Sequence, residues 1–138
     1  MISIIIGNKG SGKTKRLISL VNEAVSSSKG NVVCVEKVKK LTYDISHKAR
    51  LIATDNYSIC GFDALYGFLA GICAGNYDVT HVFVDATFRI GGRDYEELVG
   101  FFTKLNKVSE ESGAEFVFTL SCDESSLPEQ VFELTKKL

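Results

Sequence analysis

A glycine-rich segment near the N-terminus constrains the fold of this chain more than any other feature. It reads Gly7-Asn8-Lys9-Gly10-Ser11-Gly12-Lys13-Thr14, a complete G-x-x-x-x-G-K-[ST] motif. The β-branched apolar run Ile2 to Ile6 precedes it, and the apolar residues after Thr14 recur at helical spacing. The order of strand, glycine-rich loop and helix predicts that the chain opens with a parallel α/β unit.

The residue types of this motif suit the binding of phosphate groups. Glycine lets backbone N–H groups point inward around phosphate oxygens, a lysine reaches the β- and γ-phosphates, and a hydroxyl binds Mg²⁺. The predicted helix adds the positive end of its dipole at the same place. We therefore expect Gly7 to Thr14 to bind a nucleoside triphosphate, with Lys13 in a catalytic role and Thr14 as a ligand of Mg²⁺. The alternative is a glycine-rich turn without a ligand.

An aspartate ends the apolar run Thr80 to Val84. Because ligands of open α/β folds bind at the carboxyl edge of the sheet, we expect Asp85 at the same edge as the glycine-rich loop. A carboxylate there is suited to hold Mg²⁺ together with Thr14. The alternative is that Asp85 caps the helix that follows.

The remaining sequence alternates between strand-like and helix-like segments, without an internal repeat. This alternation predicts parallel strands joined by helical crossovers, and hence a three-layer α/β/α fold with a mostly parallel central sheet. A length of 138 residues fits a single domain, residues 1–138. Strands are expected at 31–36, 41–45, 49–53, 80–85 and 115–120, and helices from Thr14 to about Val25, at 61–74, at 94–112 and after a capping box at Ser126 and Glu129.

The segment Ala64 to Gly75 has no charged residue and carries Gly67, Gly71 and Gly75 at regular spacing. Such spacing is typical of helices that associate closely in membranes. A run of twelve residues is nevertheless short of the roughly 18 that span a bilayer. We therefore expect a buried core helix whose glycines permit close backbone approach, with a soluble dimer interface or membrane contact as the alternatives.

Charge and cysteine usage limit the remaining classes of function. Sixteen basic and seventeen acidic residues give a net charge of −1, so nucleic acid is not indicated as a partner, although a local basic patch stays open. Four dispersed cysteines and two histidines offer no zinc ligand set and favour reduced, mostly buried thiols. Because no signal-peptide pattern opens the chain, we expect a cytoplasmic protein without a membrane span.

On these residues the chain resembles a P-loop NTPase, with Gly7 to Thr14 as its Walker A motif and Val82 to Asp85 as its Walker B motif. The further strand expected at 115–120 is similar to the RecA-like branch of this superfamily. The spacing also resembles, more weakly, the nucleotide-binding domain of thymidine kinases. The resemblance implies ATP and Mg²⁺ as cofactors, and ATP is favoured over GTP because the chain has no N/T-K-x-D element.

The chain departs from these families at one catalytic position. Thymidine kinases and many related ATPases carry a glutamate base directly after the Walker B aspartate, and the residue here is Ala86. Thymidine kinases also carry a cysteine-based zinc module and a substrate-covering lasso, for which this chain has no ligand pairs. If water is activated, the first candidate base is Glu36 at the end of the strand 31–36, as in some RecA-like proteins, and weaker candidates are Asp44 and Asp123. The alternative for Glu36 is an exposed strand-end charge.

Four further polar residues lie near the expected phosphate site. Thr119 and Ser121 end the strand after Walker B, where RecA-like proteins carry a residue that senses the γ-phosphate; each could equally be a turn residue. Arg89 and Arg93 flank Gly91-Gly92. A flexible loop carrying two guanidiniums would sense phosphate or act as an arginine finger in trans, and the alternative is a pair of solvated arginines.

The sequence thus predicts Mg²⁺-dependent ATP binding with slow or partner-stimulated hydrolysis, the stimulus being a second copy or a protein partner. One alternative is a nucleotide-controlled protein-binding module without catalysis. Another is a small-molecule kinase similar to thymidine kinase, which would need a second substrate pocket near Asp85 to Arg93.

Overall fold

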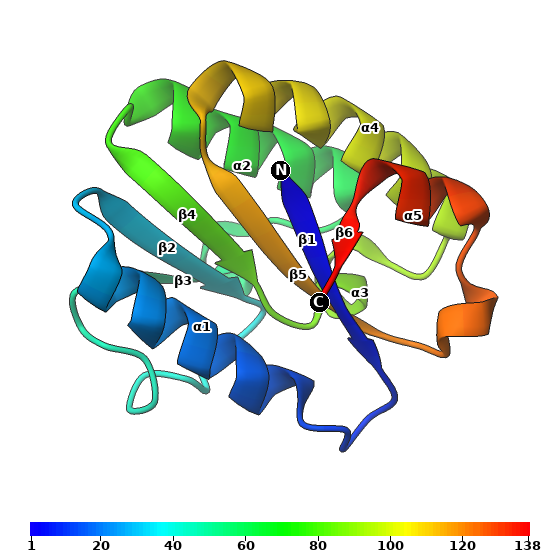
Figure 1. Cartoon of the computed structure of the whole chain (residues 1–138), viewed down its shortest axis with the longest axis horizontal. Helices are drawn as coiled ribbons and strands as arrows, with labels where there is room; N and C mark the ends of the chain where they lie inside the picture. The colour runs from blue at the N-terminus through cyan, green and yellow to red at the C-terminus, as the bar shows by residue number, and fades with distance from the viewer.

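The computed structural model describes all residues, 1–138, and is built around one six-stranded sheet (Figure 1). Every neighbouring pair of strands is parallel, and the order across the sheet is β3-β2-β4-β5-β1-β6. The strands are β1 (Ile2–Gly7), β2 (Asn31–Glu36), β3 (Arg50–Ala53), β4 (Val79–Val84), β5 (Glu115–Ser121) and β6 (Lys136–Lys137). The helices are α1 (Lys13–Ser27), α2 (Phe62–Gly75), α3 (Thr87–Gly91), α4 (Tyr95–Ser112) and α5 (Glu129–Leu134).

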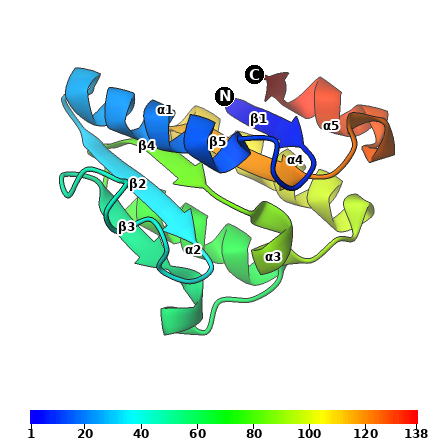
Figure 2. The same cartoon turned by 90° about the horizontal axis from the view of Figure 1, so that it is seen from below.

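Helices cover both faces of the sheet, which gives three layers (Figures 1 and 2). Helix α1 covers one face, where its apolar stripe of Leu17, Val21 and Ala24 packs in one core cluster with strand residues such as Ile5 and Val117. Helices α2 and α4 cover the opposite face. Side chains of a strand alternate between faces, so β1 and β5 are apolar on both sides. The predicted three-layer α/β/α class is confirmed.

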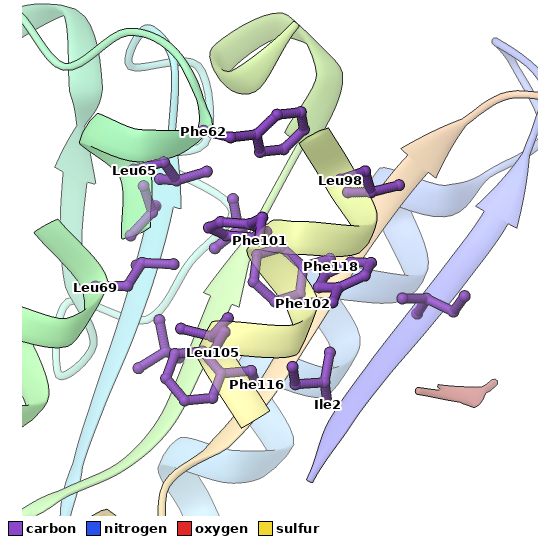
Figure 3. Packing of buried hydrophobic residues seen from close by; sticks show 14 of the residues in the cluster. Ile2, Phe62, Leu65, Leu69, Leu98, Phe101, Phe102, Leu105, Phe116 and Phe118 are labelled. Carbon is purple, nitrogen blue, oxygen red and sulfur yellow. The ribbon is translucent and has the colours of Figure 1, made fainter. Parts of the chain in front are cut away.

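The larger core lies between the sheet and helices α2 and α4 (Figure 3). Phe101 and Phe102 of α4 lie against Phe118 of β5, with ring centroids 5.6 and 5.3 Å apart. Phe62 at the start of α2 reaches Phe101 at 5.1 Å. Each fully buried aromatic of this kind contributes about 1.5–3 kcal/mol to folding. This core holds β5 and the start of α2 beside the edge of the sheet where the motifs described above lie.

The strand register brings the ends of three strands to one edge. Strand β5 lies between β1 and β4, pairing Gly7 with Ser121 on one side and Val84 with Phe118 on the other. The glycine-rich loop after β1 and Asp85 after β4 therefore emerge at the same carboxyl edge, one strand apart. This is the edge at which parallel α/β sheets bind their ligands.

The glycines of α2 lie on its outer face. The inward stripe of Leu65, Leu69 and Cys73 is buried, as the sequence predicts. Gly67 and Gly71 are exposed, and a Cβ built on either would meet no atom within 4 Å. The expectation that these glycines permit close packing inside the core is therefore wrong. None of the helices is both long enough and apolar enough to cross a membrane.

The expected strand at 41–45 is a pair of turns. Leu41 and Ile45 are buried, but both Asp44 and Ile45 donate their backbone N–H groups to the Leu41 carbonyl at 3.0 Å. The two apolar residues are four apart, which matches one helical turn better than the alternation of a strand. The strand expected at 49–53 is present as β3.

The expected capping box is also wrong. Ser126 ends a short 3₁₀ turn (Glu124–Ser126), and α5 begins at Glu129 after Pro128 without a side-chain cap. Pro128 occupies the N-cap position and has no side-chain acceptor, so the first N–H groups of α5 have no side-chain cap. The sequence did not predict α3 or β6.

Candidate nucleotide-binding site

The glycine-rich loop joins β1 to α1, and its conformation requires glycine at several positions. Gly10 and Gly12 have φ angles of +85° and +87°, in the left-handed region that other residues adopt only at a cost. A Cβ on Gly7 would lie 2.4 Å from Ser11 Oγ, so a side chain there would displace the loop. The Ser11 N–H closes the turn by donating to the Asn8 carbonyl at 3.0 Å.

The start of α1 offers unpaired N–H groups to the loop. Gly12 is the N-cap, and the first helical bond runs from Arg16 N to Gly12 O at 3.0 Å. The backbone N–H groups at the helix start before Arg16 therefore lack intrahelical acceptors, and they stand at the positive end of the helix dipole. Lys13 folds back over the loop, 9% exposed, and donates to Asn8 O at 3.1 Å. The arrangement is suited to bind an anion.

The carboxylate of Asp85 faces the first turn of α1. Thr14 Oγ1 lies 3.2 Å from both Asp85 oxygens, and Thr119 Oγ1 of β5 donates to Asp85 Oδ1 at 2.8 Å. Asp85 is 9% exposed, whereas Thr14 is open to solvent. The N-cap of α3 is Ala86, without a side-chain cap, so Asp85 does not cap this helix. One hydroxyl and one carboxylate are thus held together at the mouth of the loop.

Thr119 positions this carboxylate. Its hydroxyl also accepts the Ala86 N–H at 2.7 Å, and its side chain is fully buried. Ala86 has a φ of +54°, a left-handed conformation that turns the chain from β4 into α3 at a cost of about 1 kcal/mol. Because both hydrogen-bonding functions of the Thr119 hydroxyl are used inside the protein, this geometry does not support the hypothesis that Thr119 senses a γ-phosphate. The only feature of the sequence that could have indicated this role is the hydroxyl of Thr119 within the otherwise apolar run of β5.

A cleft of about 780 Å³ opens at this edge, within the size range of small-molecule sites. Cationic side chains dominate its walls, which favours a ligand with several negative charges. Ser121 lies at its rim, half-buried. The charged and hydroxyl-bearing side chains that line the cleft are Lys9, Lys13, Thr14, Glu36, Lys37, Lys40, Asp85, Arg89, Arg93 and Ser121.

Glu36 reaches this cleft although β2 does not neighbour β1. Strands β4 and β5 lie between them, yet the carboxylate lines the same cleft as Asp85. Glu36 is 4% exposed, so the alternative of an exposed strand-end charge is wrong. Its oxygens accept the N–H groups of Lys40 at 3.0 Å and Leu41 at 3.3 Å.

The burial of Glu36 raises the pKa of its carboxyl group. The two backbone N–H groups oppose this shift, and the negative charge of Asp85 reinforces it. A raised pKa is a property that a general base at neutral pH requires. The two hydrogen bonds leave further lone pairs on the carboxylate, so Glu36 can still accept from a water.

Arg93 and Gly91 are held firmly. The Arg93 guanidinium lies 5.1 Å from the centre of the Phe88 ring and donates to the Ser121 carbonyl at 3.2 and 3.0 Å. Gly91 is buried, and a Cβ there would lie within 2.4–2.6 Å of the Phe62 ring. The expected flexible loop at Gly91 is therefore wrong, because this glycine is needed for packing. Arg89 remains exposed on α3.

The two weaker base candidates lie in different places. Asp123 Oδ1 accepts the Asn8 side-chain N–H at 2.7 Å, so Asp123 fastens the glycine-rich loop to the segment after β5. Asp44 is not among the residues that line the cleft. The contact between Asn8 and Asp123 could not be predicted from the sequence, since it joins residues that are far apart in the chain.

Comparison with known proteins supports the fold. No family model matches the chain, and no curated protein matches it. Among solved structures, the chain is similar to the flagellar accessory protein FlaH from Methanocaldococcus jannaschii, with a TM-score of 0.60 and 16% identity over 96% of this chain. It spans 65% of that protein's length. At this identity the likeness shows a shared fold and no more, so the ligand has to be inferred from the residues of the cleft.

Proposed function

We propose that this protein binds ATP with Mg²⁺ at the carboxyl edge of the sheet and hydrolyses it slowly, or faster with a partner. The observation that carries the proposal is the Thr14 hydroxyl 3.2 Å from both Asp85 oxygens, beside Lys13 and the loop N–H groups. The left-handed glycines support it, since they turn backbone N–H groups toward a phosphate.

The residues present fit the two cofactors. Lys13 and the N–H groups at the start of α1 would compensate the charge of the phosphates. Thr14 and Asp85 would hold Mg²⁺, which prefers a few protein oxygens and keeps several waters. When bound, Mg²⁺ neutralises charge that develops on the phosphate oxygens. Thr119 would keep the Asp85 carboxylate oriented while this happens.

Slow turnover follows from the residues available as a base. Ala86 has no group that could orient the attacking water. Because Asp85 would hold Mg²⁺, Glu36 is the carboxylate in the cleft that could act as the base. Its two hydrogen bonds to backbone N–H groups fix its position. Phosphoryl transfer depends on positioning and electrostatics, so a base that is not fully placed lowers turnover more than binding. A partner that closes the cleft would raise the rate.

The proposal is tested by titrating the protein with a fluorescent ATP analogue, with Mg²⁺ and with EDTA. Lys13→Ala removes a charge-assisted contact to phosphate, and we expect affinity to fall about 10- to 100-fold. Lys15→Ala is the matched control, because Lys15 lies two residues further along α1, is exposed and does not line the cleft. Equal affinity of Lys13→Ala and the wild type would refute the phosphate site.

A second candidate is a nucleotide-controlled binding module without catalysis. Ala86 favours this candidate, because it has no carboxylate at the position after Asp85 where related ATPases carry their base. Phosphate release measured with excess ATP separates the two functions. Release that Glu36→Gln abolishes supports hydrolysis, whereas tight binding without any release supports the binding module.

A further inference from the structure

A run of basic residues follows β2 and reaches the first residue of β3. We call residues 37–50 the basic segment. It holds five basic residues and one acidic residue, a net charge of +4, in a chain whose net charge is −1. The balanced total therefore conceals a local patch of positive charge. The basic residues are Lys37, Lys39, Lys40, Lys48 and Arg50.

The basic segment is held in place from beneath. Asn22 of α1 accepts the Ser46 N–H at 2.8 Å and donates to the Asp44 carbonyl at 3.0 Å, which ties the segment to the helix. The cationic side chains point outward from this anchored base, since they are exposed or half-buried. The apolar residues of the segment pack into the core beneath α1: Leu41, Ile45 and Ala49 are all buried.

Most of these cations have no counter-charge. Lys37 pairs with Asp55 at 2.8 Å, and no carboxylate lies within ion-pair distance of the other four. Lys39, Lys48 and Arg50 line a common hollow of about 390 Å³. Several unpaired cations at one place favour a polyanion as the ligand, because each contact with a phosphate releases a counterion.

The neighbouring side chains distinguish between polyanions. Tyr43, in the middle of the basic segment, is 100% exposed. An exposed aromatic in the same segment as several cations matches the combination that binds single-stranded nucleic acid, in which bases stack on rings and cations follow the backbone. A duplex would need a helix or strand to enter a groove, and residues 37–49 form neither, since β3 begins only at Arg50. Insertion into a membrane interface would need a row of exposed apolar side chains, whereas Leu41, Ile45 and Ala49 are buried.

We propose that residues 37–50 form a binding surface for single-stranded nucleic acid, with Lys39, Lys48 and Arg50 contacting phosphates and Tyr43 stacking on a base. The surface adjoins the nucleotide cleft, because Lys37 and Lys40 line that cleft and Glu36 accepts the Lys40 N–H. Bound nucleic acid would therefore be a stimulating partner for hydrolysis. This stimulation rests on the proposed function, whereas binding of nucleic acid does not.

The test is fluorescence anisotropy of labelled dT20 and rU20 with the full chain and no nucleotide, at several salt concentrations. If Lys39, Lys48 and Arg50 contact phosphates, the logarithm of affinity should fall with the logarithm of salt concentration at a slope of about −2. Tyr43→Ala should weaken binding about tenfold through lost stacking. The triple variant K39E/K48E/R50E should lose binding to both oligonucleotides.

The matched control is K29E/K107E/K136E, which changes the net charge equally at exposed positions away from the basic segment. It should bind within about threefold of the wild type at moderate salt, because distant charges are screened beyond about 8–10 Å. Equal losses in both triple variants, or no loss in the first, would overturn the proposal. So would binding to phosphatidylserine vesicles without binding to either oligonucleotide.

A further arm separates this proposal from the proposed function. Lys13→Ala should bind dT20 as the wild type does, whatever happens to ATP. Oligonucleotide binding without any ATP binding would refute the proposed function alone. If the protein binds both ATP and dT20, dT20 should raise the rate of phosphate release by the wild type and leave the rate of K39E/K48E/R50E unchanged. Absence of stimulation in the wild type would refute the link between the two sites.

Discussion

Replacement of Thr119 by valine isolates the hydroxyl that holds Asp85. Valine keeps the shape of the side chain and removes one donor and one acceptor. The donor bond to Asp85 Oδ1 is 2.8 Å long, and the accepted bond from Ala86 N is 2.7 Å long. A hydrogen bond to a charged group is worth about 1.5–3 kcal/mol, and a buried N–H left without a partner costs about 1–3 kcal/mol.

We expect Thr119→Val to lower the free energy of unfolding by about 3 kcal/mol, below the sum because Ala86 is half-buried and water replaces part of its lost bond. With a urea m-value of about 2 kcal/mol/M, the midpoint followed by far-UV circular dichroism should fall by about 1.5 M. The affinity for ATP should fall more with Mg²⁺ than with EDTA, because the Asp85 carboxylate loses its orientation.

Thr54→Val is the matched control. Thr54 is also fully buried, but its hydroxyl has no hydrogen-bond partner. Removing an unpartnered buried hydroxyl should leave stability unchanged or raise it by about 1 kcal/mol. Equal shifts of the urea midpoint for the two variants would refute the role assigned to Thr119. Thr119→Ser, which keeps the hydroxyl, should retain the Mg²⁺ dependence of ATP affinity.

Three further predictions concern packing and thiols. Gly91→Ala should destabilise the protein by about 1–3 kcal/mol in urea unfolding, because the new Cβ meets the Phe62 ring. Gly67→Ala, on the open face of α2, should stabilise the protein by up to about 1 kcal/mol. The reverse order of stability would contradict the packing described. A thiol reagent should modify Cys60 rapidly in the native protein and the three buried cysteines only on unfolding. Burial raises the pKa of the Cys34 thiol, so its contribution to the free energy of unfolding is complete below about pH 8.5 and decreases as the pH rises further. A Cys34→Ala variant that loses as much stability at alkaline pH as the wild type would contradict this.

The sequence predicted the parts of the fold that depend on local patterns. The unit of β1, glycine-rich loop and α1 follows from neighbouring residues, and so does the placement of Asp85 at a strand end. The insertion of β5 between β1 and β4 joins segments distant in the chain, and no periodicity encodes it. The two-residue strand β6 is too short to leave any pattern.

The site was predictable in its residue types and less so in its contacts. The sequence favours Glu36 as a base because it ends a strand, but the place of that strand in the sheet could not be predicted; Glu36 reaches the cleft although β4 and β5 lie between β2 and β1. The sequence suggested Thr119 as a γ-phosphate sensor or a turn residue. Its hydroxyl instead bonds Asp85 and Ala86, which follow another strand, so these hydrogen bonds could not be inferred. On α2, glycine spacing alone cannot tell which face of the helix is buried; Leu65 and Leu69 settle this in the structure.

The central claim is that the glycine-rich loop and Asp85 form one site for the phosphates of ATP and Mg²⁺. A crystal structure with a non-hydrolysable ATP analogue and Mg²⁺ tests it most directly. The account predicts phosphate oxygens within hydrogen-bond distance of Lys13 Nζ and of the loop N–H groups, with Mg²⁺ bound by Thr14 Oγ1 on the side of Asp85. Phosphates located elsewhere, with Lys13 Nζ still donating to the Asn8 carbonyl, would contradict it.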